Sequence, residues 1–149
     1  MKNKILLADD DRAVRKALSR AFESEGFDVL MAEDGRAAVR EFIAESPVLV
    51  LLDLNMPDKD GWQAFDLIET LHPYVPVIII TARPNQFGRA KMAGADALME
   101  KPLDLPLLVQ TVNRLLKEPE ELRLARLCSS EFTTERLPAQ PAGFPVNER

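Results

Sequence analysis

The sequence has little of what would define several other kinds of protein. It contains one cysteine, Cys128, among 149 residues, so an internal disulfide and a multi-cysteine metal site are excluded. No apolar run approaches the roughly 18 residues of a membrane-spanning helix, and the first residues lack a signal-peptide pattern. Lysine and arginine number 19 against 24 acidic residues, and the net charge of −5 argues against a basic surface for nucleic acid. We therefore expect a cytoplasmic protein with no membrane partner and no direct nucleic-acid binding.

The sequence does contain a regular alternation of short apolar runs and longer amphipathic stretches. The runs are short enough to be strands, and most lack polar alternation, as do strands that are buried on both faces. Between them, apolar residues recur at the three- and four-residue spacing of amphipathic helices. The five expected strands cover residues 4–8, 27–31, 49–53, 76–81 and 97–100. This order predicts an α/β fold, a doubly wound five-stranded parallel sheet with helices on both faces.

The chain changes character at about residue 117. Residues 3–117 contain all of the expected strands and are predicted to form one domain. Residues 118–149 form a C-terminal extension in which three leucines favour one short helix, and several prolines among polar residues follow. We expect this extension to be partly helical and then flexible.

Polar residues stand where four of the expected strands end. Asp9 and Asp10 follow the first strand, Asp53 ends the third, Thr81 ends the fourth and Lys101 follows the fifth. Because the carboxyl ends of parallel strands meet at one edge of the sheet, these five side chains are expected to converge. Such an edge is where open α/β sheets place their ligand sites.

The chemistry of this set favours phosphoryl transfer. Carboxylates that are held together repel one another unless a cation enters, and Mg²⁺, with Mn²⁺ as a substitute, suits Asp9 and Asp10 at a strand end. Asp53 can then act as a nucleophile that forms an acyl phosphate. Lys101 offers a compact positive charge to the phosphoryl oxygens, and the Thr81 hydroxyl can donate a hydrogen bond to one of them.

The same residues carry a resemblance to a known family. Over about residues 3–117 the chain resembles the receiver domain of two-component response regulators, which has a flavodoxin-like fold. Single motifs of this kind are weak, but the whole set stands in the expected order and spacing. The matching motifs are Asp9-Asp10-Asp11 after an apolar run, Leu52-Asp53-Leu54-Asn55-Met56-Pro57 with Asp60-Gly61, Ile80-Thr81-Ala82, Gly94-Ala95-Asp96 and Lys101-Pro102.

The resemblance implies a phosphorylation-dependent signalling switch. Asp53 is expected to accept a phosphoryl group from a histidine kinase or a histidine phosphotransfer protein. The main-chain carbonyl of Asn55 is implied as a Mg²⁺ ligand beside the carboxylates of Asp9, Asp10 and Asp53. Thr81 is implied as the switch hydroxyl, and the peptide bond between Lys101 and Pro102 as cis.

The resemblance also bears on activity and partners. The protein is not expected to be an enzyme beyond its own phosphorylation and slow autodephosphorylation. An unknown downstream protein target is implied, and a homodimer through the fourth helix, fifth strand and fifth helix is expected. One position departs from the family pattern: Leu98 stands where an aromatic switch residue is common. We expect Leu98 to weaken or alter the rearrangement of residues 84–98 that follows a movement of Thr81.

Three other interpretations remain open. An aspartate-nucleophile phosphatase of the haloacid dehalogenase type would need a second aspartate as general acid where Asn55 stands. A degenerate receiver would act as a constitutive interaction module, but the set of site residues is intact. A flavodoxin would share the fold alone, and no phosphate loop rich in Ser, Thr and Gly follows the first strand.

Overall fold

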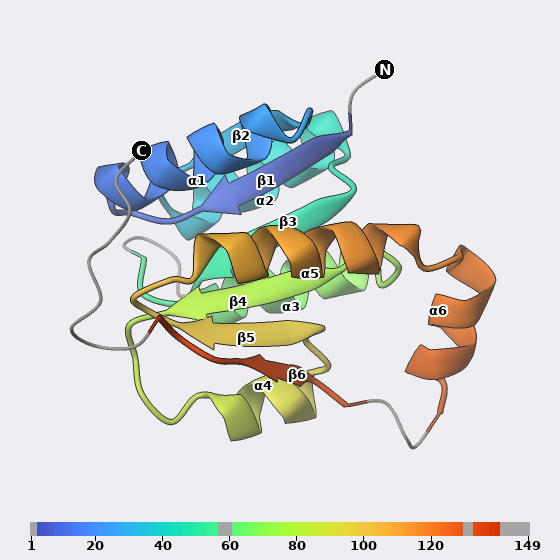
Figure 1. Ribbon diagram of the computed structural model, residues 1–149. Coiled ribbons are helices and arrows are strands. Elements are labelled where there is room, and N and C mark those ends of the chain that lie inside the picture. Colours follow the sequence, from blue (N-terminus) through green and yellow to red (C-terminus); the bar gives the residue numbers. More distant parts are fainter. Residues whose placement is uncertain (1–2, 57–60, 130–132, 141–149) are drawn as a thin grey trace.

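A parallel sheet forms the middle layer of the protein (Figure 1). The computed structural model describes residues 3–56, 61–129 and 133–140. Within them the strand order is β2-β1-β3-β4-β5-β6, and every pair is parallel. The strands are β1 (Lys4–Ala8), β2 (Asp28–Ala32), β3 (Leu49–Asp53), β4 (Val77–Thr81), β5 (Ala97–Glu100) and β6 (Glu135–Leu137).

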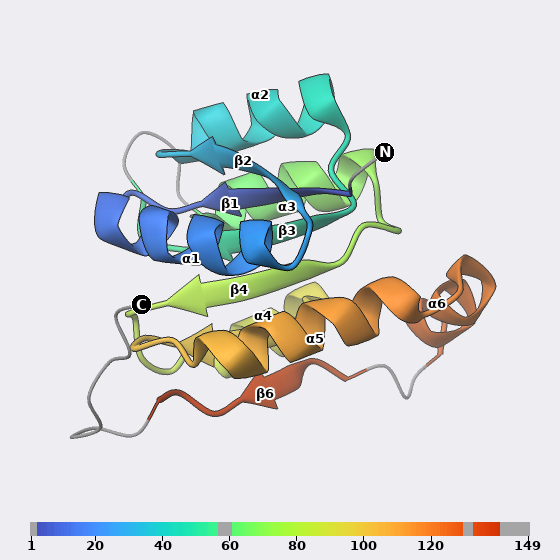
Figure 2. The ribbon, with the colours of Figure 1, turned by 45° about the horizontal axis from the view of Figure 1, so that its top comes forward.

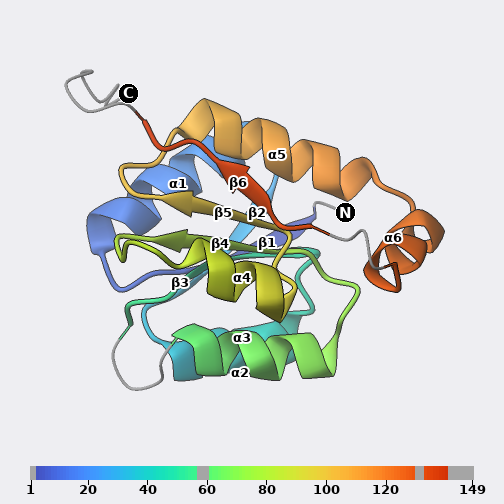
Figure 3. The same ribbon diagram turned by 90° about the horizontal axis from the view of Figure 1, so that it is seen from below.

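Helices cover both faces of this sheet. Seen from below in Figure 3, α1 and α5 lie on one face, and α2, α3 and α4 lie on the other. Each face encloses its own cluster of buried apolar side chains. The helices are α1 (Arg12–Ser24), α2 (Gly35–Glu45), α3 (Gly61–Leu71), α4 (Phe87–Ala93), α5 (Leu105–Lys117) and α6 (Glu120–Leu127). The predicted doubly wound parallel fold is therefore confirmed.

Local sequence explains where these elements begin and end. Every residue of β3 and β4 is buried, as expected for strands without polar alternation. Asp11, Asp34 and Asp104 each precede a helix and accept hydrogen bonds from free amides of its first turn. Gly94 ends α4 with φ +88°, a left-handed conformation that favours glycine.

The C-terminal extension departs from the expectation. The described residues contain six strands, so the predicted number of five is wrong by one. Part of the segment expected to be flexible forms β6, which pairs with β5 in parallel register, Leu98 opposite Arg136. The segment Glu135-Arg136-Leu137 is too short and too charged to show a strand pattern in the sequence. Its strand conformation depends on pairing with residues that are distant in the chain. Pro141 and Pro145 lie outside the described residues.

The helices of the described ranges are short. None of those within residues 3–56 and 61–129 has both the length and the apolar character needed to cross a bilayer.

Candidate functional site

Three carboxylates meet at the carboxyl edge of the sheet. Asp9 and Asp10 follow β1, and Asp53 is the last residue of the neighbouring strand β3. One oxygen from each of these side chains lies within 4.8 Å of the others. Asp9 and Asp53 are buried, whereas Asp10 is exposed. The structure thus brings together the acidic residues that the sequence analysis singled out.

Lys101 is the positive charge of this group. Its Nζ lies 2.8 Å from Asp9 Oδ2 and 3.6 Å from Asp53 Oδ2. The loop that carries Lys101 follows β5, and its amide donates a hydrogen bond to the Thr81 carbonyl at 2.8 Å. The Lys101-Pro102 peptide bond is cis, as the family resemblance implied. Lys101 therefore joins the ends of four strands, β1, β3, β4 and β5.

The charges shift one another's protonation. Burial raises the pKa of Asp53 to about 6, and the neighbouring charge of Asp9 adds to this rise. The Asn55 amide and Lys101 act in the opposite direction. For Lys101 itself, burial lowers the pKa, but the close contact with Asp9 and the charges of the carboxylates outweigh this effect and raise the pKa. The negative charge of the three carboxylates is thus only partly compensated by Lys101.

The donor set fits a hard divalent cation. Oxygen ligands, two of them from carboxylates at one strand end, are what Mg²⁺ prefers. Asp9 Oδ1 accepts a hydrogen bond from the Asp11 amide at 2.8 Å. The buried Oδ2 of Asp9 has the Lys101 ion pair but no hydrogen bond of normal geometry among the described residues. An acceptor with spare capacity beside two further carboxylates is consistent with a cation site.

Thr81 stands beside the group with its side chain buried. Its Oγ1 accepts a hydrogen bond from the Arg83 amide at 2.9 Å, so its own proton is free to be donated. The Arg83 guanidinium in turn donates to Asn55 Oδ1 at 3.3 Å. The Asn55 amide donates to Asp53 Oδ1 at 3.2 Å. Arg83 thereby links the loop after β4 to the loop after β3.

Leu98 lies in the middle of β5, with 1% of its surface exposed. It belongs to the core cluster on the side of α4, together with Ala90 and Ala95. The side chain is therefore part of the packing beneath α4.

Gly61 has a role that sequence reasoning missed. The motif around Asp53 includes Gly61, which begins α3 and packs directly on the backbone that carries Asp53. A Cβ atom at this position would lie 2.4 Å from Leu54 Cα and 2.5 Å from the Asp53 carbonyl oxygen. Its amide donates to the Leu54 carbonyl at 3.1 Å. Pro57 and Asp60, which belong to the same motif, lie outside the described residues.

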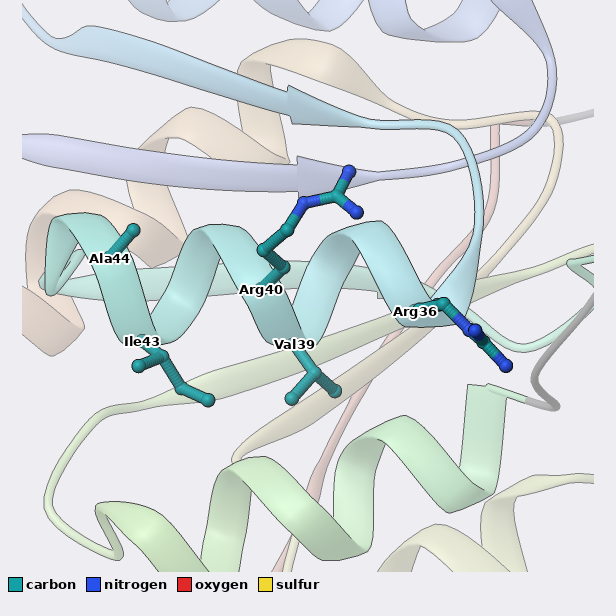
Figure 4. Close-up of a pocket in the computed structure, with 5 residues that line it drawn as sticks. All are labelled: Arg36, Val39, Arg40, Ile43 and Ala44. Atoms are coloured by element: carbon teal, nitrogen blue, oxygen red, sulfur yellow. The ribbon is translucent and has the colours of Figure 1, made fainter.

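A surface hollow lies elsewhere. It encloses about 560 Å³ and is lined by five residues of α2 alone: Arg36, Val39, Arg40, Ile43 and Ala44 (Figure 4). In this view Val39 and Ile43 point toward α3, whereas Arg40 points toward β1 and β2. None of the residues at the carboxyl edge lines it, so this hollow is separate from the acidic site.

The fold and the site together define a class, a parallel α/β domain with an acidic site opposite a lysine. A family model described as the response regulator receiver domain matches residues 5–113. The chain belongs to this family, and the resemblance inferred from the sequence is confirmed.

Similar proteins agree with this assignment. The chain is 38% identical over 117 residues to the transcriptional regulatory protein CpxR of Escherichia coli K12, covering 77% of this chain and 50% of CpxR. It is 33% identical over 121 residues to the transcriptional regulatory protein TrcR of Mycobacterium tuberculosis, covering 80% of this chain and 47% of TrcR. The chain thus spans about half the length of these relatives.

A solved structure extends the comparison to the fold. The CheY-like receiver domain protein from Methanospirillum hungatei is 27% identical to this chain and superposes with a TM-score of 0.76. The match covers 82% of this chain and 98% of that one.

Proposed function

We propose that Asp53 is the phosphoacceptor of this receiver domain. The observation that carries the proposal is the arrangement of Asp53 beside Asp9 and Asp10 on one side and Lys101 on the other. The phosphoryl donor is a histidine kinase or a histidine phosphotransfer protein, in keeping with the family. The phosphorylated form acts on a downstream protein, whose identity the site does not specify.

Each residue has a part in the reaction. An oxygen of Asp53 forms a bond to phosphorus as the bond from phosphorus to the donor nitrogen breaks. The residues that would hold Mg²⁺ are Asp9, Asp10 and Asp53, with the main-chain carbonyl of Asn55. When bound, this ion supplies neutralising charge to the carboxylates and the phosphoryl oxygens. Lys101, 3.6 Å from Asp53 Oδ2, pairs with the phosphoryl group once it is in place.

Thr81 and Leu98 then determine the response. Thr81 has a buried hydroxyl whose proton can be donated to a phosphoryl oxygen. Leu98, buried beneath α4, replaces an aromatic side chain that would swing inward, so the movement of residues 84–98 is smaller. The chain catalyses only its own phosphorylation and slow dephosphorylation. The cytoplasmic location expected from the sequence stays a prediction.

The test is phosphorylation by a small donor. Incubation with acetyl phosphate and Mg²⁺ should add one phosphoryl group, seen by intact mass spectrometry, and chelation of the metal should prevent it. Asp53→Asn should abolish the adduct, because the amide is a poor nucleophile. Asp66→Asn is the matched control, since Asp66 is an exposed carboxylate on α3, and it should be phosphorylated like the wild type.

Other outcomes would point to the alternatives. A wild-type chain that never forms the adduct would be a degenerate receiver. Rapid release of phosphate from external phosphoesters would indicate a phosphatase, although Asn55 leaves that reaction without its general acid.

A further inference from the structure

The edge of β5 is occupied by the chain's own C-terminal segment. Residues 133–140, here called the C-terminal strand segment, contain β6, which runs parallel to β5. Figures 1 and 2 both show β6 at the edge of the sheet, and Figure 3 shows α5 on one side of it and α4 on the other. Without it, the peptide groups of β5 on that side would be free to pair with another chain. The predicted homodimer through this face would need the same edge.

Side chains of the segment contact both neighbouring helices. The buried Thr134 hydroxyl donates to the Ala95 carbonyl at 2.6 Å and lies 3.3 Å from the carbonyl of Ala90, in the middle of α4. The guanidinium of Arg136 lies 5.3 Å from the centre of the Phe87 ring, also on α4.

The other side of the segment contacts α5. Glu135 pairs with Arg114 of α5. Leu137, with 4% of its surface exposed, is buried in the apolar cluster that α5 covers. The surface formed by α4, β5 and α5 therefore recognises a hydroxyl, an acidic, a basic and an apolar side chain in succession.

The segment is attached at its start through α6. Arg123 of α6 is buried and donates to Asp96 Oδ1 at 2.9 Å and to the Tyr74 carbonyl at 2.7 Å. A hollow of about 300 Å³ remains between the extension and α5, and Thr133 and Glu135 are among the residues that line it. The extension is thus held by two separate sets of contacts, one at α6 and one at β6. The three-residue strand β6 has one buried apolar side chain, Leu137. Such an element can detach without opening the rest of the core.

The far end of the segment reaches the loop that carries Lys101. The Gln140 amide donates to the Pro102 carbonyl at 3.0 Å. A guanidinium nitrogen of Arg136 lies 3.8 Å from Glu100 Oε1. Glu100 and Pro102 are the two neighbours of Lys101 in the chain, so the segment contacts the loop on both sides of this site residue.

We propose that the surface of α4, β5 and α5 is a recognition site for an extended segment parallel to β5, that residues 133–140 of the same chain occupy it, and that phosphorylation of Asp53 releases them. The last part rests on the proposed function. The released edge of β5 then becomes available to a partner that supplies a strand of the same pattern.

Hydrogen exchange measured by mass spectrometry on the full chain tests the occupancy. In the wild type, amides of residues 133–140 should be protected. Leu137→Asp should speed their exchange roughly ten-fold or more while β3 is unchanged. Leu122→Asp is the matched control, because it makes the same change at a side chain of α6 that is 61% exposed. In this variant the amides of residues 133–140 should exchange as in the wild type. Thr134→Val, which removes the hydroxyl but keeps the shape, should give a smaller acceleration.

Two results would overturn the occupancy. One is exchange of residues 133–140 in the wild type at the rate of an unstructured peptide. The other is a dimer, seen by sedimentation, that dissociates in step with the loss of protection in residues 133–140. In that case the protecting segment would come from a second copy of the chain.

The coupling is tested by adding Mg²⁺ and beryllofluoride, a phosphoryl mimic. Binding is checked first by a rise in melting temperature that Asp53→Asn abolishes. Exchange in residues 133–140 should then become several-fold faster. Binding without a change in exchange overturns the coupling alone. A failure of beryllofluoride to bind contradicts both the proposed function and the coupling. The occupancy of the β5 edge is tested separately, by the exchange measurements on the Leu137 and Thr134 variants.

Discussion

At the scale of single residues, the protein holds two carboxyl groups in surroundings that oppose their charge. One is Asp53, where burial and Asp9 raise the pKa to about 6. The other is Glu69, near the opposite edge of the sheet, whose pKa is raised to about 7 by burial first and then by the charge of Asp96. Arg123 acts against this rise. The raised pKa of Asp53 belongs to the proposed site, whereas the raised pKa of Glu69 has no part in the proposed chemistry.

Glu69 makes stability depend on pH. The folded chain holds the Glu69 proton more tightly than the unfolded chain does, since the pKa is about 7 against an ordinary 4.5. The contribution to stability is therefore complete below pH 4.5 and is lost as the pH rises through 7. Glu69→Gln should raise the free energy of unfolding at pH 8 by about 1 kcal/mol, discounted because the group is only partly buried. Urea unfolding at pH 5.5 and pH 8 measures this difference.

An exposed glutamate provides the control for this measurement. Glu121→Gln on α6 should leave the pH dependence as in the wild type. Equal pH profiles for the two variants would contradict the assignment to Glu69.

Most of the site residues could be predicted because their positions follow from the fold. Asp9, Asp53, Thr81 and Lys101 stand at strand ends, and parallel strands bring their ends together. The ion pair of Arg123 with Asp96 could not be predicted, since these residues lie 27 positions apart and no periodic pattern selects the partner. The same holds for Gly61, whose close approach to Asp53 depends on how α3 packs.

At the scale of elements, strands were recognisable where apolar residues run together, as in β3 and β4. β6 has one buried apolar residue, Leu137, and owes its conformation to β5 and the adjacent helices. Short strands of this kind depend on their surroundings more than on their own sequence.

The start of α3 is where an element and the site depend on each other most closely. Gly61→Ala would place a methyl group 2.4 Å from Leu54 Cα, so α3 or the end of β3 must move. We expect a loss of about 1–3 kcal/mol in the free energy of unfolding. Phosphorylation of Asp53 by acetyl phosphate should slow as well. Chemical unfolding and the rate of adduct formation measure the two effects.

Gly88→Ala is the matched control. Gly88 lies in α4, and a Cβ there meets nothing within 4 Å. Alanine favours a helix over glycine by about 0.5–1 kcal/mol, so this variant should be as stable as the wild type or more so. If Gly61→Ala matched Gly88→Ala in stability, the close approach would not constrain α3.

At the scale of the whole molecule, binding of a cation should stabilise the fold. The unfolded chain cannot hold Asp9, Asp10 and Asp53 together, so Mg²⁺ should bind the folded state selectively. At a concentration 100 times its dissociation constant, this selectivity adds about 2.7 kcal/mol to the free energy of unfolding. The melting temperature should rise with added Mg²⁺ and fall again with a chelator.

The contribution of the acidic site to this effect can be isolated. Asp10→Asn should greatly reduce the shift in melting temperature, because it removes the exposed carboxylate of the three. Asp28→Asn makes the same change at the opposite end of the sheet and should keep the full shift. Equal shifts in both variants would mean that Mg²⁺ acts through ionic strength alone.

The sixth strand also determines where the chain leaves the domain. Helix α5 ends at Lys117, and α6 lies at the edge away from the acidic site (Figure 1). β6 carries the chain back across the molecule, so that Gln140 stands one hydrogen bond from Pro102. Anything joined directly after residue 140, whether a fluorescent label, an affinity tag or a second domain, therefore starts beside the loop that carries Lys101. A probe attached there should report on that loop, whereas a purification tag is better placed at the N-terminus.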